Sequence, residues 1–171
     1  MERMYAPWRG KYVTKDGKKN KRTTGSTKDC VFCSQLAAEQ DDSYFIVKRF
    51  KYCFVMMNYY PYNIGHVMIL PYAHKGDIGA LDAKTRAEMM EVVNATVSVM
   101  NNVLRPEGFN IGMNLGIAGG GGIPGHQHIH VLPRWRGDTN FMETLSSTKL
   151  LSVDMKETFQ KLKKGFASVK I

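Results

Sequence analysis

The chain has 171 residues, of which 43% are hydrophobic, and this size and composition predict one globular domain with a sizeable core. It holds no run of about 18 apolar residues, and its first residues lack the apolar centre of a signal peptide, so we expect neither a membrane-spanning nor a secreted protein but a cytoplasmic one. The formal net charge is +9, and residues 1–29 contribute +6 of it, with nine Lys or Arg against three acids.

The N-terminal segment, residues 1–29, is predicted to be a basic arm. Residues 15–22 hold no apolar side chain to bury, so this stretch is expected to be solvated and partly disordered. The alternative is an electrostatic aid that recruits a polyanion such as a nucleotide. Nucleic acid is a less favoured partner, because no aromatic residues alternate with the charges to form a stacking surface.

The ordered domain is expected to begin at Cys30 and to open with a short helix near residues 34–39. Aromatic and β-branched residues then predict two strands, and turn-forming residues predict a loop before a third strand. In chain order these are a hairpin over 44–48 and 51–57, a loop over 58–65, and a strand over 66–70 that Pro71 ends.

A long helix follows, since Asp82 is a suitable N-cap and apolar residues recur at helical spacing up to Leu104. The rest of the chain is expected to form a fourth strand over 109–115, a glycine-rich loop, a fifth strand over 125–132 and a C-terminal helix over 154–166. Because the long helix joins the third and fourth strands, that one pairing is open to being parallel.

These elements predict an α+β fold, a largely antiparallel five-stranded sheet with a long central helix and a C-terminal helix. Residues 30–142 are expected to form the main folded domain. Residues 143–171 are expected to be a helical extension packed on the same domain.

Three histidines alternate in the fifth predicted strand, His126, His128 and His130. Alternate residues of a strand share one face, so the three rings are expected on the same side, roughly 6–7 Å apart. The pattern suits either a zinc site with an open position or an imidazole nucleophile held by its neighbours. The outer two would lie roughly 13 Å apart in a straight strand, so one ion could bind both only if the strand bent sharply.

Cys30 and Cys33 form a Cys-x-x-Cys pair, which in a reducing compartment indicates half of a metal site or a redox pair rather than a structural disulfide. A structural zinc needs four ligands, and the remaining candidates are His66, His74 and the end members of the triad. His74, at the end of a strand, is the stronger functional candidate, whereas His66 is equally suited to packing. A reduced cysteine pair without metal is the alternative.

The histidine run resembles the signature of the histidine triad superfamily, His-x-His-x-His followed by apolar residues. The match is His126-Gln127-His128-Ile129-His130-Val131-Leu132, and the resemblance extends over residues 30–142. Three further segments, Pro133-Arg134-Trp135, Gly137-Asp138-Thr139-Asn140-Phe141 and Ala6-Pro7-Trp8-Arg9, are similar to the branch that contains diadenosine tetraphosphate phosphorylases.

This resemblance implies nucleotidyl transfer in two displacements through a covalent nucleotidyl-histidine, with His128 as the nucleophile. His130 and backbone amides of the glycine loop would stabilise charge on the phosphoryl oxygens. The implied substrate contacts come from Asn58 at the ribose, Asn114 on the phosphate side, Trp135, Gly120, Gly121 and Gly122. The resemblance also implies a homodimer and a structural zinc held by Cys30, Cys33, His74 and His126.

Two positions depart from the family pattern. Gln127 stands where an apolar residue is usual, which affects the packing of that strand face. The loop from Gly119 to Ile123 offers no Ser, Thr or Gln side chain as a phosphate donor, so phosphate contacts would have to come from backbone N–H groups.

The favoured hypothesis is a zinc-containing enzyme that cleaves a dinucleoside polyphosphate, diadenosine tetraphosphate first, by phosphorolysis or hydrolysis. The alternatives are a nucleoside phosphoramidate hydrolase and a non-catalytic module that binds nucleotides or nucleic acid. A redox or zinc-sensing role for the cysteine pair is a further, weaker hypothesis. The sequence leaves open whether water or inorganic phosphate is the second nucleophile, and which base is preferred.

Overall fold

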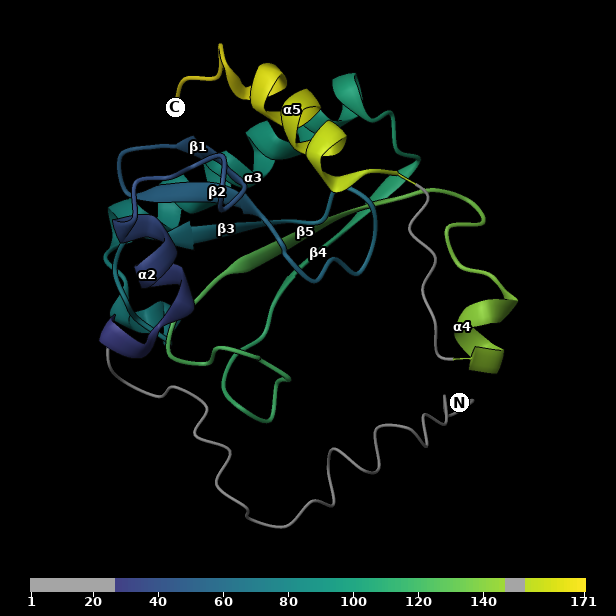
Figure 1. The fold of residues 1–171 in the computed structure, drawn as a ribbon. Coiled ribbons are helices and arrows are strands. Elements are labelled where there is room, and N and C mark those ends of the chain that lie inside the picture. The colour runs from purple at the N-terminus through teal and green to yellow at the C-terminus, as the bar shows by residue number, and fades with distance from the viewer. Residues whose placement is uncertain (1–26, 147–152) are drawn as a thin grey trace.

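The structure of the protein is a computed structural model that describes residues 27–146 and 153–171 (Figure 1). The arm expected over residues 1–29 lies outside the described residues except for Thr27–Asp29, which form the short 3-10 helix η2. The similarity noted at Ala6-Pro7-Trp8-Arg9 lies outside them entirely. The extension expected over 143–171 is described apart from residues 147–152.

Five strands form one sheet in the order β1-β2-β3-β5-β4, and all neighbours in it are antiparallel. The strands are β1 (Ile46–Arg49), β2 (Cys53–Met57), β3 (Val67–Pro71), β4 (Gly108–Met113) and β5 (Ile129–Arg134). This arrangement confirms the predicted α+β fold with an antiparallel sheet. The parallel pairing considered for the third and fourth strands does not form, because β5 lies between β3 and β4.

The helices of the described residues are α2 (Val31–Ala37), α3 (Ala83–Val103), α4 (Phe141–Ser146) and α5 (Met155–Phe166), with a 3-10 turn η3 (Ile78–Ala80) before α3. Asp82 caps α3 as predicted, since its carboxylate accepts a hydrogen bond of 2.7 Å from the N–H of Thr85. Asp154 caps α5 in the same way through the N–H of Lys156. The sequence did not predict α4, and α2 begins earlier than residue 34.

The two faces of the sheet are covered unequally, with α3 and α5 on one side and α2 on the other (Figure 1). The larger core, toward α3 and α5, includes Val55, Val67, Ile69, Val131, Phe159 and Leu162. The smaller core, toward α2, includes Phe32, Phe54, Met56, Met68 and Leu70. His130 pairs across the sheet with Met68, so His130 faces the α2 side. A seven-residue helix covers only part of that face, which leaves space beside it.

The fifth strand begins only after His128, so the predicted strand start at residue 125 is wrong. Instead of pairing with a neighbouring strand, the N–H of Gln127 donates to the carbonyl oxygen of Lys75 at 2.7 Å. The chain therefore bends just before β5. This bend separates the side chain of His126 from those of His128 and His130.

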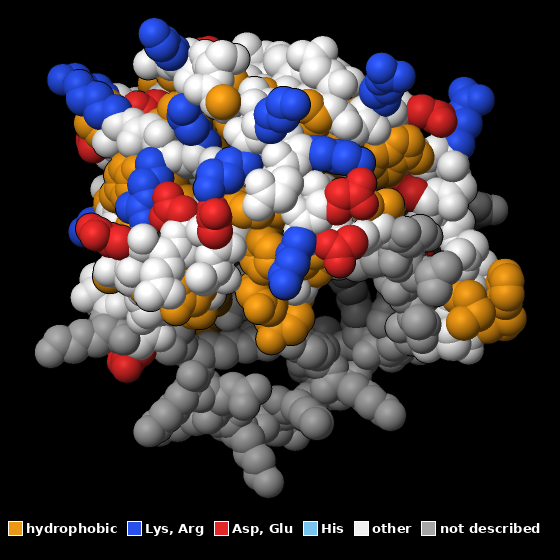
Figure 2. All heavy atoms as spheres, turned by 45° about the horizontal axis from the view of Figure 1, so that its top comes forward, with side chains coloured by type: hydrophobic (Ala, Val, Ile, Leu, Met, Phe, Trp, Pro, Cys, Tyr) orange, Lys and Arg blue, Asp and Glu red, His pale blue; other side chains and the backbone are white. Residues whose placement is uncertain are grey.

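Charged side chains of both signs share the surface around α5. Figure 2 shows Lys and Arg spread over the face seen there, with Asp and Glu between them. Lys161 pairs with Glu157 at 2.7 Å, and Lys163 pairs with Asp42. Within the described ranges, no helix is both long and apolar enough to span a membrane.

Candidate functional site

His128 is buried beside the start of β5 and held in one orientation. Its Nδ1 lies 2.9 Å from the carbonyl oxygen of His126. A carbonyl oxygen only accepts hydrogen bonds, so Nδ1 of the neutral ring carries the proton and donates it. Nε2 therefore keeps its lone pair, which is the form that a nucleophilic imidazole requires.

His130 is held by a chain of hydrogen bonds that begins at the backbone. The N–H of Tyr62 donates to Nδ1 of His66 at 3.2 Å, so the proton of neutral His66 lies on Nε2. This Nε2 is 2.9 Å from Nδ1 of His130, which must accept the bond. The proton of His130 is then on its own Nε2, which is buried and has no hydrogen-bond partner within the described residues.

Burial favours the neutral form of His66, His128 and His130. Burial, with repulsion from the neighbouring imidazoles, lowers the pKa of His66 to about 3 and that of His130 to about 4. Burial also lowers the pKa of His128, although its hydrogen bond to a backbone carbonyl opposes the shift. The ring centroids of His128 and His130 are 4.7 Å apart. A lone pair and an N–H donor therefore lie side by side, which suits attack on phosphorus and stabilisation of its oxygens.

Four metal-ligating side chains converge beside His128, and their ligand atoms all lie within 4.8 Å of one another. They are Cys30 and Cys33 at the start of α2, His74 after β3, and His126. Cys30 Sγ is 3.4 Å from Nδ1 of His126, and Cys33 Sγ is 3.5 Å from Nδ1 of both histidines. Sulfur and nitrogen ligands of a tetrahedral zinc ion are about 3.5 Å apart, given Zn–S and Zn–N bonds of about 2.3 and 2.0 Å. These dimensions suit a tetrahedral metal site.

The protonation of the cluster also suits a metal. Nε2 of His126 lies 2.9 Å from the carbonyl oxygen of Pro71, so it carries the proton and leaves the lone pair on Nδ1 for a metal. Burial, followed by its contact with Cys30, raises the pKa of the Cys33 thiol to about 11. The thiol is therefore protonated when no metal is bound, and a soft divalent ion would displace the proton.

A cavity of about 380 Å³ adjoins the histidines on the α2 side of the sheet. Phe32 lines it, and the ring centroid of Phe32 is 5.4 Å from that of His128. Met68 also lines it and pairs across the sheet with His130. The other lining residues come from α2, from Ser43 and Tyr44 before β1, from the end of β2 and the loop that follows it, and from Ile123 before the bend. The cavity therefore suits a flat, largely apolar group bound next to the two rings.

Comparisons with known proteins show the family of this chain. The HIT domain family matches residues 39–137. The chain belongs to the HIT family. It is 32% identical over 158 residues to a Mycobacterium tuberculosis protein named AP-4-A phosphorylase, a match that covers 92% of this chain and 80% of that protein. It is 25% identical over 134 residues to an uncharacterized HIT-like protein of Methanocaldococcus jannaschii, covering 78% of this chain and 98% of that protein.

Solved structures of HIT proteins share the fold. A Zn-bound histidine triad family protein from Mycobacterium smegmatis matches with a TM-score of 0.68 at 23% identity, covering 83% of this chain and 96% of that one. A hypothetical histidine triad nucleotide-binding protein from Sulfolobus tokodaii matches with a TM-score of 0.62 at 26% identity, covering 80% and 88%. The likeness extends over most of each HIT protein.

Asn58, expected at the ribose, lies at the cavity of this HIT domain with its amide already engaged. Its Oδ1 accepts a hydrogen bond of 3.0 Å from the N–H of Tyr60, and its Nδ2 is 3.3 Å from Nδ1 of His66. Asn58 thus supports the ring that orients His130. Its contact with a ribose stays a prediction.

Asn114 and the glycine loop lie at the same end of the sheet as His128. Asn114 directly follows Met113, the last residue of β4, which pairs with Ile129. In the loop of Gly120, Gly121 and Gly122, a Cβ at Gly121 would be 3.6 Å from the carbonyl oxygen of Asn114. Gly120 has a φ of 85°, a conformation that favours glycine. Phosphate contacts from this region stay a prediction.

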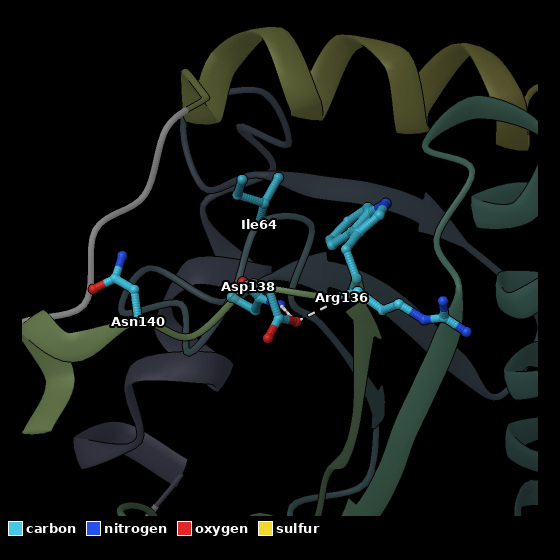
Figure 3. Close-up of a pocket in the computed structure, with 7 residues that line it drawn as sticks. Ile64, Arg136, Asp138 and Asn140 are labelled. Atoms are coloured by element: carbon cyan, nitrogen blue, oxygen red, sulfur yellow. Dashed lines mark hydrogen bonds between the residues drawn. The ribbon is translucent and has the colours of Figure 1, made fainter.

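Trp135 lies in a different place from the other expected site residues of the HIT domain. It lines a separate cavity of about 230 Å³, and its Nε1 donates to the carbonyl oxygen of Arg105 at 3.1 Å. Figure 3 shows Ile64, Asp138 and Asn140 around this second cavity, with the guanidinium of Arg136 pointing away from them. The structure therefore does not bring Trp135 to the cavity beside His128.

Asp138 stabilises the turn at the end of β5 by accepting hydrogen bonds. It accepts hydrogen bonds of 2.7 and 2.8 Å from Arg134, 2.7 Å from Nδ2 of Asn63, and 3.1 Å from the N–H of Trp135. The Arg134 guanidinium, with these donors, holds the pKa of Asp138 well below its usual range. Asn63 belongs to the same loop as Tyr62, so the carboxylate ties that loop to β5.

Two functional features were missed by reasoning from the sequence. The role of His66 was left open between packing and function, although it stands one residue before a strand that pairs with β5. The wall that α2 contributes to the cavity was not predicted. Val31, Phe32 and Gln35 line it, and the available signal was their helical spacing around the cysteine pair.

Proposed function

We propose that this HIT protein cleaves dinucleoside polyphosphates, with diadenosine tetraphosphate as the first candidate, through a nucleotidyl group carried on His128. The observation that carries the proposal is the opposite protonation of two adjacent rings. Nε2 of His128 keeps a lone pair, whereas Nε2 of His130 keeps a proton and has no partner in the described residues. The name of the M. tuberculosis relative, AP-4-A phosphorylase, supports the choice of substrate.

In the first step, Nε2 of His128 attacks the α-phosphorus of the bound nucleotide. The P–N bond forms as the bond to the bridging oxygen breaks, and the polyphosphate leaves with that electron pair. The N–H of His130 donates a hydrogen bond to a phosphoryl or leaving oxygen, where negative charge grows. The carbonyl oxygen of His126 stabilises the positive charge that develops on the attacking ring.

In the second step, an oxygen nucleophile attacks the same phosphorus and the P–N bond breaks, which restores neutral His128. Inorganic phosphate as the nucleophile would release ADP, and water would release AMP with loss of one proton. The chemistry at His128 is the same in both cases. The choice between them depends on whether the backbone N–H groups around Gly121 hold a second phosphate.

The cavity beside the histidines is proposed to hold the nucleoside. Its volume of about 380 Å³ and its apolar walls suit a base stacked near Phe32. Because Phe32 lies against His128 and Met68 lies across from His130, a nucleoside there would place its 5′-phosphate at the two rings.

We further propose that Cys30, Cys33, His74 and His126 hold a zinc ion with a structural role. When bound, the ion would cross-link the start of α2, the end of β3 and the bend before β5. The residues it fixes include His126, whose carbonyl oxygen orients His128.

A homodimer is proposed on the basis of the edge that β4 forms in the described part of the sheet. β4 is the outermost strand next to β5, and Ile111 on it is 48% exposed. An exposed edge with apolar side chains is suited to pairing with a second copy by a two-fold axis. Size-exclusion chromatography with light scattering tests this, and a monomeric protein would contradict it.

The function is tested by mixing the purified protein with diadenosine tetraphosphate, with and without inorganic phosphate, beside the His128→Ala variant. ADP plus ATP formed only with phosphate would indicate phosphorolysis, and AMP plus ATP formed without it would indicate hydrolysis. The variant should be folded, by circular dichroism, and inactive. A fully active variant, or a wild type that prefers a nucleoside phosphoramidate, would contradict the proposal.

A further inference from the structure

We infer that Gln35 selects adenine in the cavity beside the histidines. The inference rests on the proposed function, because it takes this cavity as the nucleoside site. It adds which base is accepted and which side chain reads it.

The position of Gln35 follows from the way α2 divides its residues between two sites. Val31, Phe32 and Gln35 line the cavity, as expected of residues spaced three or four apart on one helix face. Cys33, on the same helix, turns instead toward the metal cluster, with its Sγ 3.5 Å from His126. The amide of Gln35 thus extends from a helix that is anchored beside the reacting histidines.

Among the described residues that line the cavity, Gln35 and Asn58 are the two with amide side chains. The amide of Asn58 is bonded to the N–H of Tyr60 and to His66. The amide of Gln35 has no hydrogen-bond partner within the described residues. Gln35 is therefore the amide that is left to bond a ligand.

An amide suits one base edge better than the others. Adenine presents a donor at N6 beside an acceptor at N7, and a Gln side chain offers an acceptor and a donor to match both. Guanine and hypoxanthine present two acceptors, O6 and N7, at that edge. Neither orientation of the amide satisfies both of them.

The remaining walls do not select between the purines at that edge. Val31, Phe32, Met56 and Met68 offer no hydrogen-bond partner to a polar group of the base. Four hydroxyls also line the cavity, those of Ser43, Tyr44, Tyr59 and Tyr60. A hydroxyl either donates or accepts, so none of them distinguishes one base edge from another. Discrimination at the N6–N7 edge therefore falls to Gln35.

The test compares the affinities of AMP, IMP and 7-deaza-AMP by isothermal titration calorimetry on the full-length, zinc-loaded protein. The variants are Gln35→Leu and the control Gln160→Leu, which makes the same change at an exposed position on α5. The wild type and the control should bind AMP about tenfold more tightly than either analogue. Gln35→Leu should lose this preference, because leucine offers neither a donor nor an acceptor.

Equal affinities for the three nucleotides in the wild type, or a preference that survives in Gln35→Leu, would overturn the inference. If Gln35→Leu does not fold, Gln35→Glu replaces it. A carboxylate accepts from N6 but does not donate to N7, so that variant should bind 7-deaza-AMP at least as tightly as AMP. Cleavage of diadenosine tetraphosphate without any base preference would support the proposed function and contradict this inference. If the protein binds none of the three nucleotides, both the proposed function and this inference are contradicted.

Discussion

Nε2 of His66 donates a hydrogen bond to Nδ1 of His130 across 2.9 Å, so a histidine outside the triad decides which nitrogen of His130 carries the proton. The positions of these protons are set first by the backbone N–H of Tyr62, because this group can only donate a hydrogen bond. Through the two neutral rings, the donor at Tyr62 places the proton of His130 on its Nε2, in the ring next to His128. The main chain of one loop therefore sets the hydrogen-bonding chemistry of a strand that follows much later in the sequence.

His66 is predicted to act as a positioning residue. His66→Leu removes the donor to His130, and kcat should fall by about 100-fold because the N–H of His130 is no longer fixed on Nε2. His66→Gln keeps an N–H donor near the position of Nε2, so its kcat should fall less than that of His66→Leu. KM should change little in both variants, since His66 does not line the nucleoside cavity.

Nitrogen-15 NMR of the histidine rings separates this role from simple packing. The wild-type protein should show His130 protonated at Nε2, and His66→Leu should show a mixture of tautomers. Wild-type kcat in His66→Leu, or an unchanged tautomer, would show that His66 does not order His130.

Stability is predicted to fall as the pH falls from about 6.5 to about 4. Burial places the pKa of His66 near 3 and that of His130 near 4 in the folded protein, below the value of an unfolded chain. The unfolded chain therefore binds more protons in this pH window. The stability that the two neutral histidines contribute is complete above about pH 6.5 and is lost as the pH falls below it. Between pH 7 and pH 5 each such histidine should lower the free energy of unfolding by roughly 2 kcal/mol.

Urea unfolding of the wild type and His66→Gln at pH 7, 6 and 5 measures this contribution. Both proteins keep the metal ligands, so acid release of the metal affects them alike. The difference in unfolding free energy between the wild type and His66→Gln should decrease by about 2 kcal/mol as the pH falls from 7 to 5. Parallel pH dependences would refute the assignment to His66.

Local patterns predicted most of the fold. Aromatic and β-branched residues marked the first strands, Asp82 marked the start of the helix that it caps, and apolar residues at helical spacing marked the C-terminal helix. The start of β5 was misplaced because the N–H of Gln127 bonds to Lys75, a partner that no local pattern reveals. The short helix α4 carried little periodicity, since it has only six residues.

The candidate site was predictable in composition but not in arrangement. The spacing of His126, His128 and His130 marked three rings as candidates for function, but a straight strand would have placed all three on one face. The structure turns His126 to the carbonyl oxygen of Pro71, a contact between distant parts of the chain. The hydrogen bond between His66 and His130 likewise depends on the pairing of β3 with β5, which the sequence does not specify.

Metal removal is predicted to weaken nucleotide binding through α2. This helix has seven residues, too few to be stable alone, and Cys30 at its N-cap makes no side-chain capping bond. Without the metal, the wall formed by Val31 and Phe32 should loosen, and the affinity for AMP should fall by about tenfold. Calorimetry on chelated and zinc-reloaded protein measures the change, and hydrogen exchange reports on α2.

Cys33→Ala and Cys53→Ala form a matched pair for this prediction. Cys53 is buried in β2, away from the cluster, so its variant should keep one zinc per chain by elemental analysis, whereas Cys33→Ala should lose it. Zinc-free wild-type protein with both thiols of the pair reactive would refute the metal site. Unchanged AMP affinity after chelation would refute the link through α2.

Asp138→Asn is predicted to destabilise the fold more than any comparable change of a surface acid. The carboxylate accepts hydrogen bonds from Arg134, Asn63 and Trp135, and its side chain is only 7% exposed. An Asn side chain turns an NH2 group toward donors that require an acceptor, so the free energy of unfolding should fall by about 2–3 kcal/mol. The loss should persist from pH 7 to pH 5, because the low pKa of Asp138 keeps it ionised throughout this range.

Asp42→Asn is the matched control, since Asp42 pairs with Lys163 at the surface and its side chain is 66% exposed. That change should alter stability by no more than about 0.5 kcal/mol, as exposed ion pairs contribute little. Urea unfolding of both variants tests the contrast. Because Asn63 and Tyr62 share a loop, Asp138→Asn should also lower kcat by loosening the N–H that orders His66. Equal stabilities of the two variants would mean that Asp138 does not hold the loop against β5.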